Sequence, residues 1–508
     1  MASSAQQSSV GWLDALGGPW GIARALLAGV QVGNPVRQAP DMPGVHPPRE
    51  TMPPALFLFH FLRNPLRCLP QKVYEEPIVF AEDRRTAWAT DPDLTEAIFL
   101  DSHDVFPKPP LESRVFQDPL GNSVLTAQGE AWRWQRKAVA PLFRPRDILE
   151  LVPRMAAPAE RCVAAWSRAG ILHDHPIDRD VTEATYEAIS DTLFGGMAIE
   201  ESLKIRSAVS TYLNAAPWEI VSALMRRPAE AWHPGRPGLD AATRDMRSAI
   251  TSVYRRWTEA GGEGRHLLSH LVAAHDNGQP MSEAQILNNL ITFLNAGHET
   301  TAKAITWTLY VLARHPVWQE AVRREVAEVV GDGPIAAEHI DRLRLTRLVL
   351  EESMRLYAPA PVLTRIATRD IEVGGHHIAA ETLVFIPIWA IHRHRRLWAE
   401  PDRFDPMRFL PERRAGYRRT QYMPFGFGPR ICIGATFAMV EGVVMLAAML
   451  RGARLAWNGR EAPEPLGRVT LWPRGGMRLD VVPAAMARRR RSTSRRSGLQ
   501  STVSSPAP

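Results

Sequence analysis

The chain has 508 residues, and its 61 Lys and Arg against 54 Asp and Glu give a formal net charge of +7 and a sequence pI near 9.6. Hydrophobic residues at 45% and charged residues at 23% are ordinary for a globular protein, which excludes a disordered chain. The three cysteines, Cys68, Cys162 and Cys432, exclude a disulfide scaffold and a cysteine-rich zinc site, since none lies in a Cys-x-x-Cys pair.

The first 50 residues are expected to form an N-terminal extension with a proline-rich linker. Residues 11–30 are apolar, but a Gly-Gly-Pro-x-Gly segment interrupts them, so they predict neither a membrane span nor a secretory signal. The apolar run 55–62 predicts a first helix packed on the body, with weak peripheral membrane contact as the alternative. We therefore expect a cytoplasmic protein, with or without membrane association.

Residues 51–483 are expected to form one large domain. The pattern is mostly helical, with strand-rich stretches near 362–388 and 468–482. The sequence contains no Gly-Lys-Ser/Thr, His-Glu-x-x-His or Gly-x-Ser-x-Gly, so the common nucleotide-binding and hydrolase signatures are missing. The predicted fold class is mainly α with small β-sheets.

One predicted helix contains the sequence Ala-Gly-His-Glu-Thr-Thr at residues 296–301. It is expected to begin near Ser282, which forms a capping box with Gln285, and to end before His315-Pro316. Ala296 and Thr300 are four residues apart and share a face, where the small residues leave room for a bulky cofactor. His298 is expected to lie off this face and to be structural.

The densest motif is the loop Phe425-Gly-Phe-Gly-Pro-Arg-Ile-Cys432-Ile-Gly434, which leads directly into an apolar helix. Closely spaced glycines permit positive φ and close backbone approach. A thiol at a helix N-terminus is expected to have a lowered pKa, which suits a ligand for a soft transition metal.

This loop resembles the haem-binding segment Phe-Gly-x-Gly-x-Arg-x-Cys-x-Gly of the cytochrome P450 family, without a mismatch. The resemblance extends over roughly residues 50–482 and implies the cytochrome P450 fold, haem b as cofactor and O2 as co-substrate. It implies that Cys432 is the axial ligand of the iron, that Phe425 shields the sulfur and that Arg430 meets a haem propionate. A thiolate ligand favours O–O cleavage.

The resemblance assigns roles to three further motifs. Glu299 and Thr300 match the acid–alcohol pair of the family, which relays protons. Trp132 and Arg136 match its Trp-x-x-x-Arg motif and, with Arg365, are expected to hold the haem propionates. Glu352 and Arg355 match its Glu-x-x-Arg motif, and Arg403 in Pro401-Asp-Arg-Phe404 is expected to complete a structural triad.

These assignments predict a haem-thiolate monooxygenase that inserts one oxygen atom of O2 into a small hydrophobic substrate by C–H hydroxylation or epoxidation. The expected pocket residues are mainly apolar: Phe116, Leu120, Phe293, Ala296, Val362, Leu363 and Leu471. The alternative is a haem-thiolate peroxygenase or a hydroperoxide-rearranging lyase, against which the acid–alcohol pair argues.

The sequence outside the matched body is too short for a reductase domain, so electrons are expected from NAD(P)H through a ferredoxin or flavodoxin and a reductase. A basic docking face near Cys432 is expected from a group of arginines, with a solvated surface as the alternative: Arg393, Arg395, Arg396, Arg413, Arg414, Arg418 and Arg419. The protein is expected to be a monomer.

The basic pI is explained largely by residues 484–508, which are rich in Arg and Ser. They contain six arginines and no acidic residue, and their composition predicts a disordered tail. Without these six residues the chain has 55 basic against 54 acidic residues. A nucleic-acid partner is therefore not expected.

Overall fold

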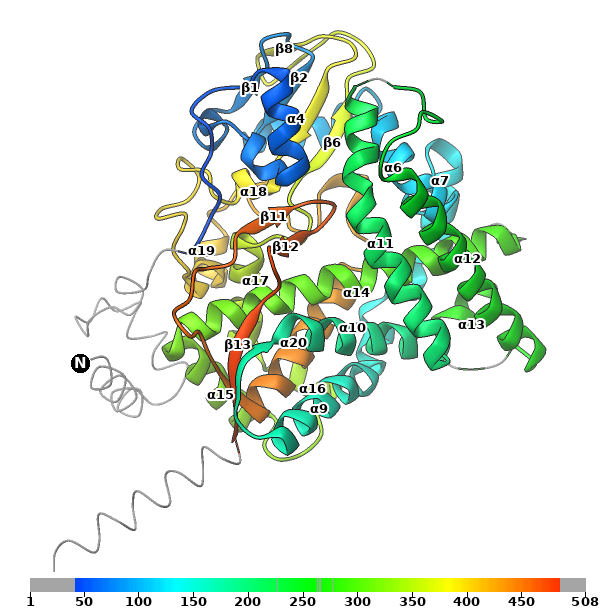
Figure 1. Cartoon of the computed structure of the whole chain (residues 1–508), viewed down its shortest axis with the longest axis vertical. Helices are drawn as coiled ribbons and strands as arrows, with labels where there is room; N and C mark the ends of the chain where they lie inside the picture. Colours follow the sequence, from blue (N-terminus) through cyan, green and yellow to red (C-terminus); the bar gives the residue numbers. More distant parts are fainter. Residues whose placement is uncertain (1–41, 226, 263, 265, 277, 485–508) are drawn as a thin grey trace, which may run out of the picture.

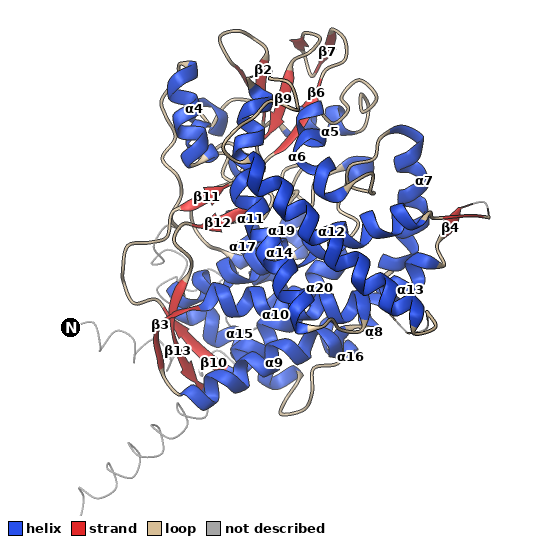
Figure 2. Cartoon of the chain, turned by 45° about the vertical axis from the view of Figure 1, so that its right-hand side comes forward, coloured by secondary structure: helices blue, strands red, loops and turns tan. Residues whose placement is uncertain are grey.

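The computed structural model describes residues 42–484 except residues 226, 263, 265 and 277. The apolar stretch 11–30 and almost all of the arginine-rich tail lie outside the described residues. Figures 1 and 2 show a body made mostly of helices, with short strands gathered toward its margins. This architecture agrees with the predicted fold class of a mainly helical domain with small sheets.

The helices follow the amphipathic segments of the sequence, and several begin at a proline, whose fixed φ suits the first turn. Their bounds are α4 Pro54–Arg63, α5 Pro92–Phe99, α6 Pro110–Leu120, α7 Gly129–Val139, α8 Pro145–Glu150, α9 Val152–Ala169, α10 Ile177–Phe194, α11 Ile199–Leu224, α12 Arg236–Glu259, α13 Leu267–Val272, α14 Glu283–Arg314, α15 Pro316–Val329, α16 Ala337–Ile340, α17 Arg344–Leu356, α18 Ile388–Ile391, α19 Pro411–Arg414 and α20 Ala435–Gly452.

The strands form one four-stranded sheet, one three-stranded sheet and three hairpins. The orders are β1-β2-β9-β6 and β10-β13-β3, and the hairpins are β4-β5, β7-β8 and β11-β12. Their bounds are β1 Ile78–Phe80, β2 Thr86–Ala89, β3 Leu172–Pro176, β4 His275–Asp276, β5 Gln279–Pro280, β6 Leu363–Ile366, β7 Ile371–Val373, β8 His376–Ile378, β9 Leu383–Ile386, β10 Ala453–Ala456, β11 Pro465–Gly467, β12 Leu471–Pro473 and β13 Arg478–Pro483. Strands therefore occupy both stretches where the sequence predicted them.

The longest helix, α14, crosses the middle of the molecule (Figure 1). Its first turn has the predicted capping box, in which the N–H of Gln285 donates to the Ser282 hydroxyl and the N–H of Ser282 donates to the Gln285 side chain. The helix ends at Arg314, before His315 and Pro316, as predicted. A buried helix of this length gives the site a rigid wall.

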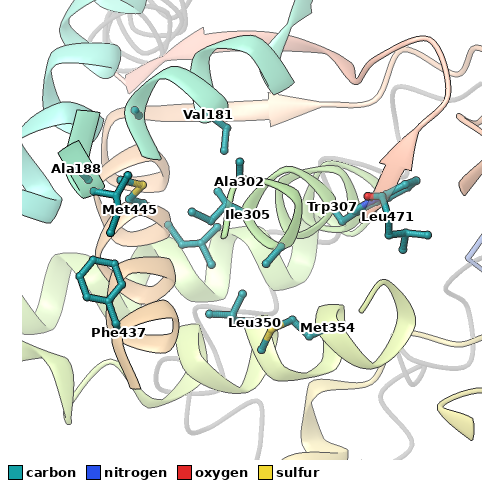
Figure 3. Close-up of a cluster of buried hydrophobic side chains, with 14 of the residues drawn as sticks. Val181, Ala188, Ala302, Ile305, Trp307, Leu350, Met354, Phe437, Met445 and Leu471 are labelled. Atoms are coloured by element: carbon teal, nitrogen blue, oxygen red, sulfur yellow. The ribbon is translucent and has the colours of Figure 1, made fainter. Parts of the chain in front are cut away.

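The core packs around α14 (Figure 3). Side chains of α10, α14, α17 and α20 meet there, including Val181, Ile305, Leu350 and Met445. The Trp307 ring stacks on Tyr357 with 4.1 Å between centroids. Among the described helices, α20 alone is long and apolar enough to cross a membrane, and 67% of it is buried inside the protein, where it carries part of this core.

Three helices and one loop complete the frame of the site. The helices α11 and α12 pack against each other, and α11 runs over α14 (Figures 1 and 2). The α4 helix packs on the C-terminal part of α11 through Phe61 and Val221. The segment 424–434 then brings Cys432 beneath α14 at the start of α20, so that a space remains between the cysteine loop and the helix.

Candidate active site

An internal cavity of about 570 Å³ lies between α14, α11, the cysteine loop and the β11–β12 turn. Its size falls in the range of small-molecule and cofactor sites. Cys432 opens on the cavity from one side, and Ala296 and Thr300 of α14 face it from the other. Ala296 is exposed although its helix is buried, because it faces this space rather than a neighbouring element. The cavity thus joins the two motifs that the sequence connected by resemblance.

The cysteine loop holds its shape through glycines and backbone bonds. Gly426 and Gly428 have φ of +74° and +73°, and a Cβ on Gly428 would lie 2.8 Å from the carbonyl oxygen of Phe99. The N–H of Cys432 donates to the carbonyl of Phe425 at 2.9 Å, so these two residues lie side by side at the cavity. Glycine is therefore required at position 428 by backbone geometry and by space.

The thiol of Cys432 differs from the expectation. Burial raises its pKa above the ordinary value, and the N–H of Gly434 and the charge of Arg136 only partly offset that effect. The predicted lowering at a helix N-terminus is therefore wrong for the protein without its cofactor. A coordinated metal deprotonates a thiol outright, so ligation would overcome this penalty.

Three arginines from distant parts of the sequence form a cluster at one end of the cavity. We call Arg136, Arg365 and Arg430 the arginine cluster; all three line the cavity together with Trp132. Arg430 lies over the Trp132 ring at 3.9 Å from its centroid and donates to the carbonyl of Ala127. Burial, together with the charges of Arg365 and Arg136, lowers the pKa of Arg430 to about 10.

The cluster has too little negative charge around it. Glu112 is the acid that acts on both Arg365 and Arg430, but it already pairs with Lys108 at 2.9 Å and accepts from the Thr364 hydroxyl. The Arg136 guanidinium has no hydrogen-bond or ion-pair partner among the described residues. Mutually repelling cations beside an apolar cavity call for an anionic ligand.

The acid–alcohol pair of the sequence faces the cavity, as predicted. The Thr300 hydroxyl donates to the carbonyl of Ala296 at 2.8 Å, and Glu299 is 5% exposed. His298 is buried away from the cavity, where its Nδ1 bonds to the carbonyl of Leu294 and its ring packs edge-on against Tyr186. The structural role predicted for His298 fits these contacts.

Glu299 has a partner that the sequence analysis missed. The Lys303 ammonium, one turn further along α14, lies 3.3 Å from Glu299 Oε1 and 3.8 Å from the centroid of the Trp472 ring. The Thr470 hydroxyl is 3.5 Å from the same carboxylate oxygen. The i, i+4 spacing of Glu and Lys was a signal in the sequence, but only the structure places both side chains in the interior.

Most predicted pocket residues line the cavity, and one does not. Phe116, Leu120, Phe293, Ala296, Val362 and Leu363 are in the wall. Leu471 is fully buried in the core beside Trp307 (Figure 3). Its carbonyl oxygen accepts a hydrogen bond from Trp307 Nε1. The prediction for Leu471 is wrong, because the side of the hairpin that faces the cavity is formed by Gly467 at the end of β11 and by residues 468–470 of the turn.

The roof of the cavity was not predicted. It comes from α11 and α4, which contribute Val209, Tyr212, Leu213, Pro217, Ile220, Phe57 and Phe61. These residues belong to no local motif. Their helical spacing indicates a buried face, but periodicity does not say which cavity that face covers.

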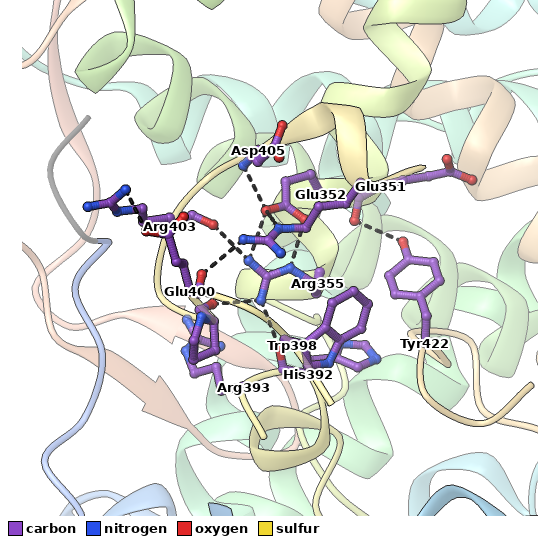
Figure 4. A network of polar contacts seen from close by, with 12 residues as sticks. Glu351, Glu352, Arg355, His392, Arg393, Trp398, Glu400, Arg403, Asp405 and Tyr422 are labelled. Carbon is purple, nitrogen blue, oxygen red and sulfur yellow. Dashed lines mark hydrogen bonds and ion pairs between the residues drawn. The ribbon is translucent and has the colours of Figure 1, made fainter. Parts of the chain in front are cut away.

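The pair Glu352–Arg355 lies outside the cavity and is fully buried (Figure 4). Arg355 Nε and Nη2 donate to the two Glu352 oxygens at 2.7 and 2.8 Å. The other guanidinium hydrogens reach the carbonyls of His392, Pro401 and Arg403. All five donors of Arg355 are therefore used, and they connect α17 to the chain segment that precedes the cysteine loop.

The prediction that Arg403 completes the triad with Glu352 and Arg355 is wrong. The Arg403 guanidinium points away from Glu352 in Figure 4 and pairs with Glu400 at 2.7 Å, while only its carbonyl accepts from Arg355. Arg408 instead places Nε 3.4 Å from Glu352 Oε1. The sequence Pro-x-Arg-Phe occurs twice, at 401–404 and 406–409, and the second copy turns toward Glu352 in a 3-10 turn.

The structure also differs from the predicted basic docking face near Cys432. Arg393 is 4% exposed and lies over the Trp389 ring at 3.6 Å, so it belongs to the core. Most of the other arginines are paired with acids in Arg395–Glu75, Arg413–Asp405, Arg414–Glu351, Arg418–Asp93 and Arg419–Glu96. Their charges are therefore largely compensated, and the face is less basic than the sequence suggested.

The residues present fit the haem that the resemblance implies. A thiol opens on the cavity beneath Ala296 and Gly297, whose small size leaves space along α14. The arginine cluster supplies cations for two carboxylates, and those cations lack sufficient anions of their own. Cys432 would hold the iron and the cluster with Trp132 would hold the propionates.

Comparisons with known proteins agree with this arrangement. The model of the family "Cytochrome P450" matches residues 56–477. A cytokinin hydroxylase of Arabidopsis thaliana is 31% identical over 415 residues, which cover 78% of each chain. A cyclooctatin synthase of Streptomyces melanosporofaciens is 32% identical over 370 residues, 72% of this chain and 78% of the relative.

The fold also matches a solved structure, the cytochrome P450DA heme domain. That structure superposes with a TM-score of 0.73 at 23% identity, and the match covers 87% of this chain and 98% of the other. The family match extends over most of the chain and includes the helix, the cysteine loop and the Glu–Arg pair described above. The protein is therefore a haem-dependent monooxygenase of the cytochrome P450 family.

Proposed function

We propose that this monooxygenase oxidises a largely apolar substrate by C–H hydroxylation or epoxidation, and that Cys432 is the residue that would hold the haem iron. The cavity is the observation that carries this proposal, because apolar side chains of α6, α11 and α14 form most of the wall opposite Cys432. Haem bound there supplies O2 activation, and the protein positions the substrate beside it. The arginine cluster and Trp132 hold the propionates.

Two residues of α14 manage protons in this proposal. The Thr300 hydroxyl is directed by its bond to the Ala296 carbonyl, and it borders the cavity next to the Glu299 carboxylate. A hydroxyl can pass a proton on while it receives one from a neighbouring acid. Thr300 therefore holds a proton at its hydroxyl on the cavity wall, and Glu299 replenishes it from the side of Lys303 and Thr470.

The assignment of Cys432 is tested spectroscopically. The Cys432→Ser variant should lose the Soret band that is characteristic of a carbon monoxide-bound, reduced haem-thiolate. Cys162→Ser is the matched control, because Cys162 is half-buried near Asp180 and does not line the cavity. Loss of the band in the control, or its retention in Cys432→Ser, would contradict the assignment.

Substrate entry is proposed from the side of α4, together with weak peripheral membrane contact of a cytoplasmic protein. Phe57 and Phe61 of α4 line the cavity, whereas Leu56 and Phe59 of the same helix are 44% and 48% exposed. Met225, directly after α11, is 59% exposed. An apolar surface next to the cavity suits a substrate that partitions into lipid.

Vesicle binding tests this contact. Wild-type protein should co-sediment with vesicles of zwitterionic lipid, and the double variant Leu56→Ser, Phe59→Ser should do so several-fold less. Ile199→Ser, which changes an exposed apolar residue at the start of α11, serves as the control. Equal sedimentation of wild type and the double variant would remove the proposed contact.

Family members draw electrons from redox partners, and an acidic ferredoxin or flavodoxin is proposed for this chain. Arg419 is exposed and lies 5.1 Å from the centroid of Phe427, a residue of the cysteine loop. Its pair with Glu96 reduces the local field but leaves donors at the surface. Arg419→Glu should raise the apparent KM for the partner at low salt, and high ionic strength should erase the difference.

A further inference from the structure

Arg468 lies in the turn between β11 and β12 and forms part of the cavity wall. Its Nη1 donates to the Asn214 side chain of α11 at 2.7 Å. Asn214 is exposed, whereas Val209 and Leu213 of the same helix line the cavity. Arg468 therefore lies at the rim, where the apolar interior meets solvent between α11 and the turn.

The charge of Arg468 has no counter-ion among residues 42–484 as described. Its Nε is buried and has no hydrogen-bond acceptor in that part of the chain. Burial and the nearby charge of the Arg474 guanidinium both lower the pKa of Arg468. Arg474 itself differs, because it donates to Glu464 Oε2 at 2.7 Å. The β11–β12 hairpin thus has one compensated and one uncompensated arginine.

An uncompensated cation on the rim of an apolar cavity is a specific feature. Keeping a charge partly out of water is unfavourable unless a hydrogen-bonded anion accompanies it. The guanidinium also has a planar set of donors that matches the two oxygens of a carboxylate. Val469 and Thr470 follow Arg468 along the wall, and Thr470 reaches Glu299 on α14, so the turn extends from the rim toward the reaction site.

We infer that Arg468 binds the carboxylate of a substrate whose remaining body is hydrocarbon. The inference rests on the proposed binding of apolar substrates in this cavity and names their class: monocarboxylic acids with a long or polycyclic apolar part. With the carboxylate at the rim, the hydrocarbon end points toward Cys432 and Thr300. Oxidation then takes place at carbons remote from the acid group.

Paired ligands test the inference on the haem-loaded enzyme. Palmitic acid and methyl palmitate, and abietic acid and methyl abietate, are titrated while the spin state of the haem is followed by absorbance. Each acid that fits should bind about tenfold more tightly than its ester, since a charge-assisted bond is lost in the ester. In Arg468→Gln the affinity for the acid should fall to that for the ester, and the affinity for the ester should change by less than about twofold.

Two variants control for charge and folding. Arg468→Lys should retain part of the preference for the acid, and Arg474→Gln should retain all of it, because Arg474 is already paired with Glu464. Equal binding of acid and ester by wild type, or a preference that survives in Arg468→Gln, would overturn the inference while apolar binding stands. If no ester or acid changes the spin state, the proposed function fails as well.

Discussion

Two buried glutamates on neighbouring helices, Glu352 and Glu299, are built in opposite ways. Glu352 receives two bonds from Arg355, one from the N–H of Asp405 at 2.9 Å, and the approach of Arg408. Glu299 has longer contacts, with the Lys303 ammonium at 3.3 Å, the Thr470 hydroxyl at 3.5 Å and His298 Nε2 at 3.9 Å, and it borders the cavity. Both carboxylates are nearly inaccessible to solvent, yet only Glu352 accepts hydrogen bonds shorter than 3 Å from the described residues.

The difference corresponds to the tasks of the two sites. A carboxylate that accepts three hydrogen bonds of 2.7 to 2.9 Å is held rigidly, and it fixes the segment leading to Cys432 against α17. A carboxylate with long contacts keeps lone pairs available, so it can exchange a proton with a hydroxyl or water. The same residue type thus serves architecture on one helix and proton transfer on the other.

The largest effect is expected at Arg355, because all five of its hydrogen-bond donors are used. Arg355→Met removes all five donors and leaves Glu352 buried and charged, which should lower the free energy of unfolding by about 3–5 kcal/mol. The variant should also lose haem, because the displaced segment no longer presents the cysteine loop. Urea unfolding and the ratio of haem absorbance to protein absorbance measure both.

A third buried glutamate, Glu441 on α20, sharpens the comparison because no cation pairs with it among the described residues. Burial raises its pKa to about 8, an increase that the Thr301 hydroxyl partly offsets. The folded state then keeps a proton that the unfolded chain releases above pH 4.5, so the stability contributed at low pH is lost as the pH rises toward 8. Glu441→Gln should remove this loss.

The expected gain of Glu441→Gln over wild type grows by about 2–3 kcal/mol between pH 5 and pH 7. Unfolding curves in urea at both values measure it. Glu299→Gln is the comparison variant, since the Glu299 carboxylate has the Lys303 ammonium at 3.3 Å whereas Glu441 has no cationic partner among the described residues. A constant difference between Glu441→Gln and wild type across this range would contradict the assignment.

The correction of the triad is tested by two matched substitutions. Arg408→Met removes a cation beside Glu352, where the Arg408 side chain is 10% exposed, and should cost about 1–2 kcal/mol of unfolding free energy. Arg403→Met removes a more exposed pair with Glu400 and leaves the Arg403 carbonyl in place, so it should cost less than about 1 kcal/mol. The reverse order would restore Arg403 to the triad.

Local motifs predicted much of this molecule because their physics is local. The Ser282–Gln285 capping box and Pro316 defined both ends of α14, and the glycines of the cysteine loop required the positive φ that they adopt. These features depend on residues within a few positions of one another.

The errors arose where tertiary structure chooses between equivalent local patterns. The two Pro-x-Arg-Phe copies differ only in which one the chain turns toward Glu352, and periodicity does not reveal that. Leu471 and Thr470 are adjacent, but Thr470 belongs to the turn that faces the cavity and Leu471 begins β12 in the core, so an error of one position moves a residue from the cavity to the core. Likewise, charge count alone did not distinguish the buried Arg393 from surface arginines.

The smallest effect in free energy, and the most informative about function, is expected at Lys303. Lys303→Met removes the cation that holds the Glu299 carboxylate in place. The carboxylate should then turn toward other partners, and proton transfer at Thr300 should become less efficient. The fraction of reducing equivalents recovered in product should fall about three- to tenfold, equivalent to ~1 kcal/mol of partitioning. Lys303→Arg keeps the charge and should stay within about twofold of wild type. Substrate affinity from the spin shift should be unchanged in both, because Lys303 acts through Glu299 rather than on the substrate. If Lys303→Met recovers as large a fraction of reducing equivalents in product as wild type, the Glu299–Lys303 pair has a structural role, as the Glu352–Arg355 pair does. The two glutamates then differ in contact geometry and not in function.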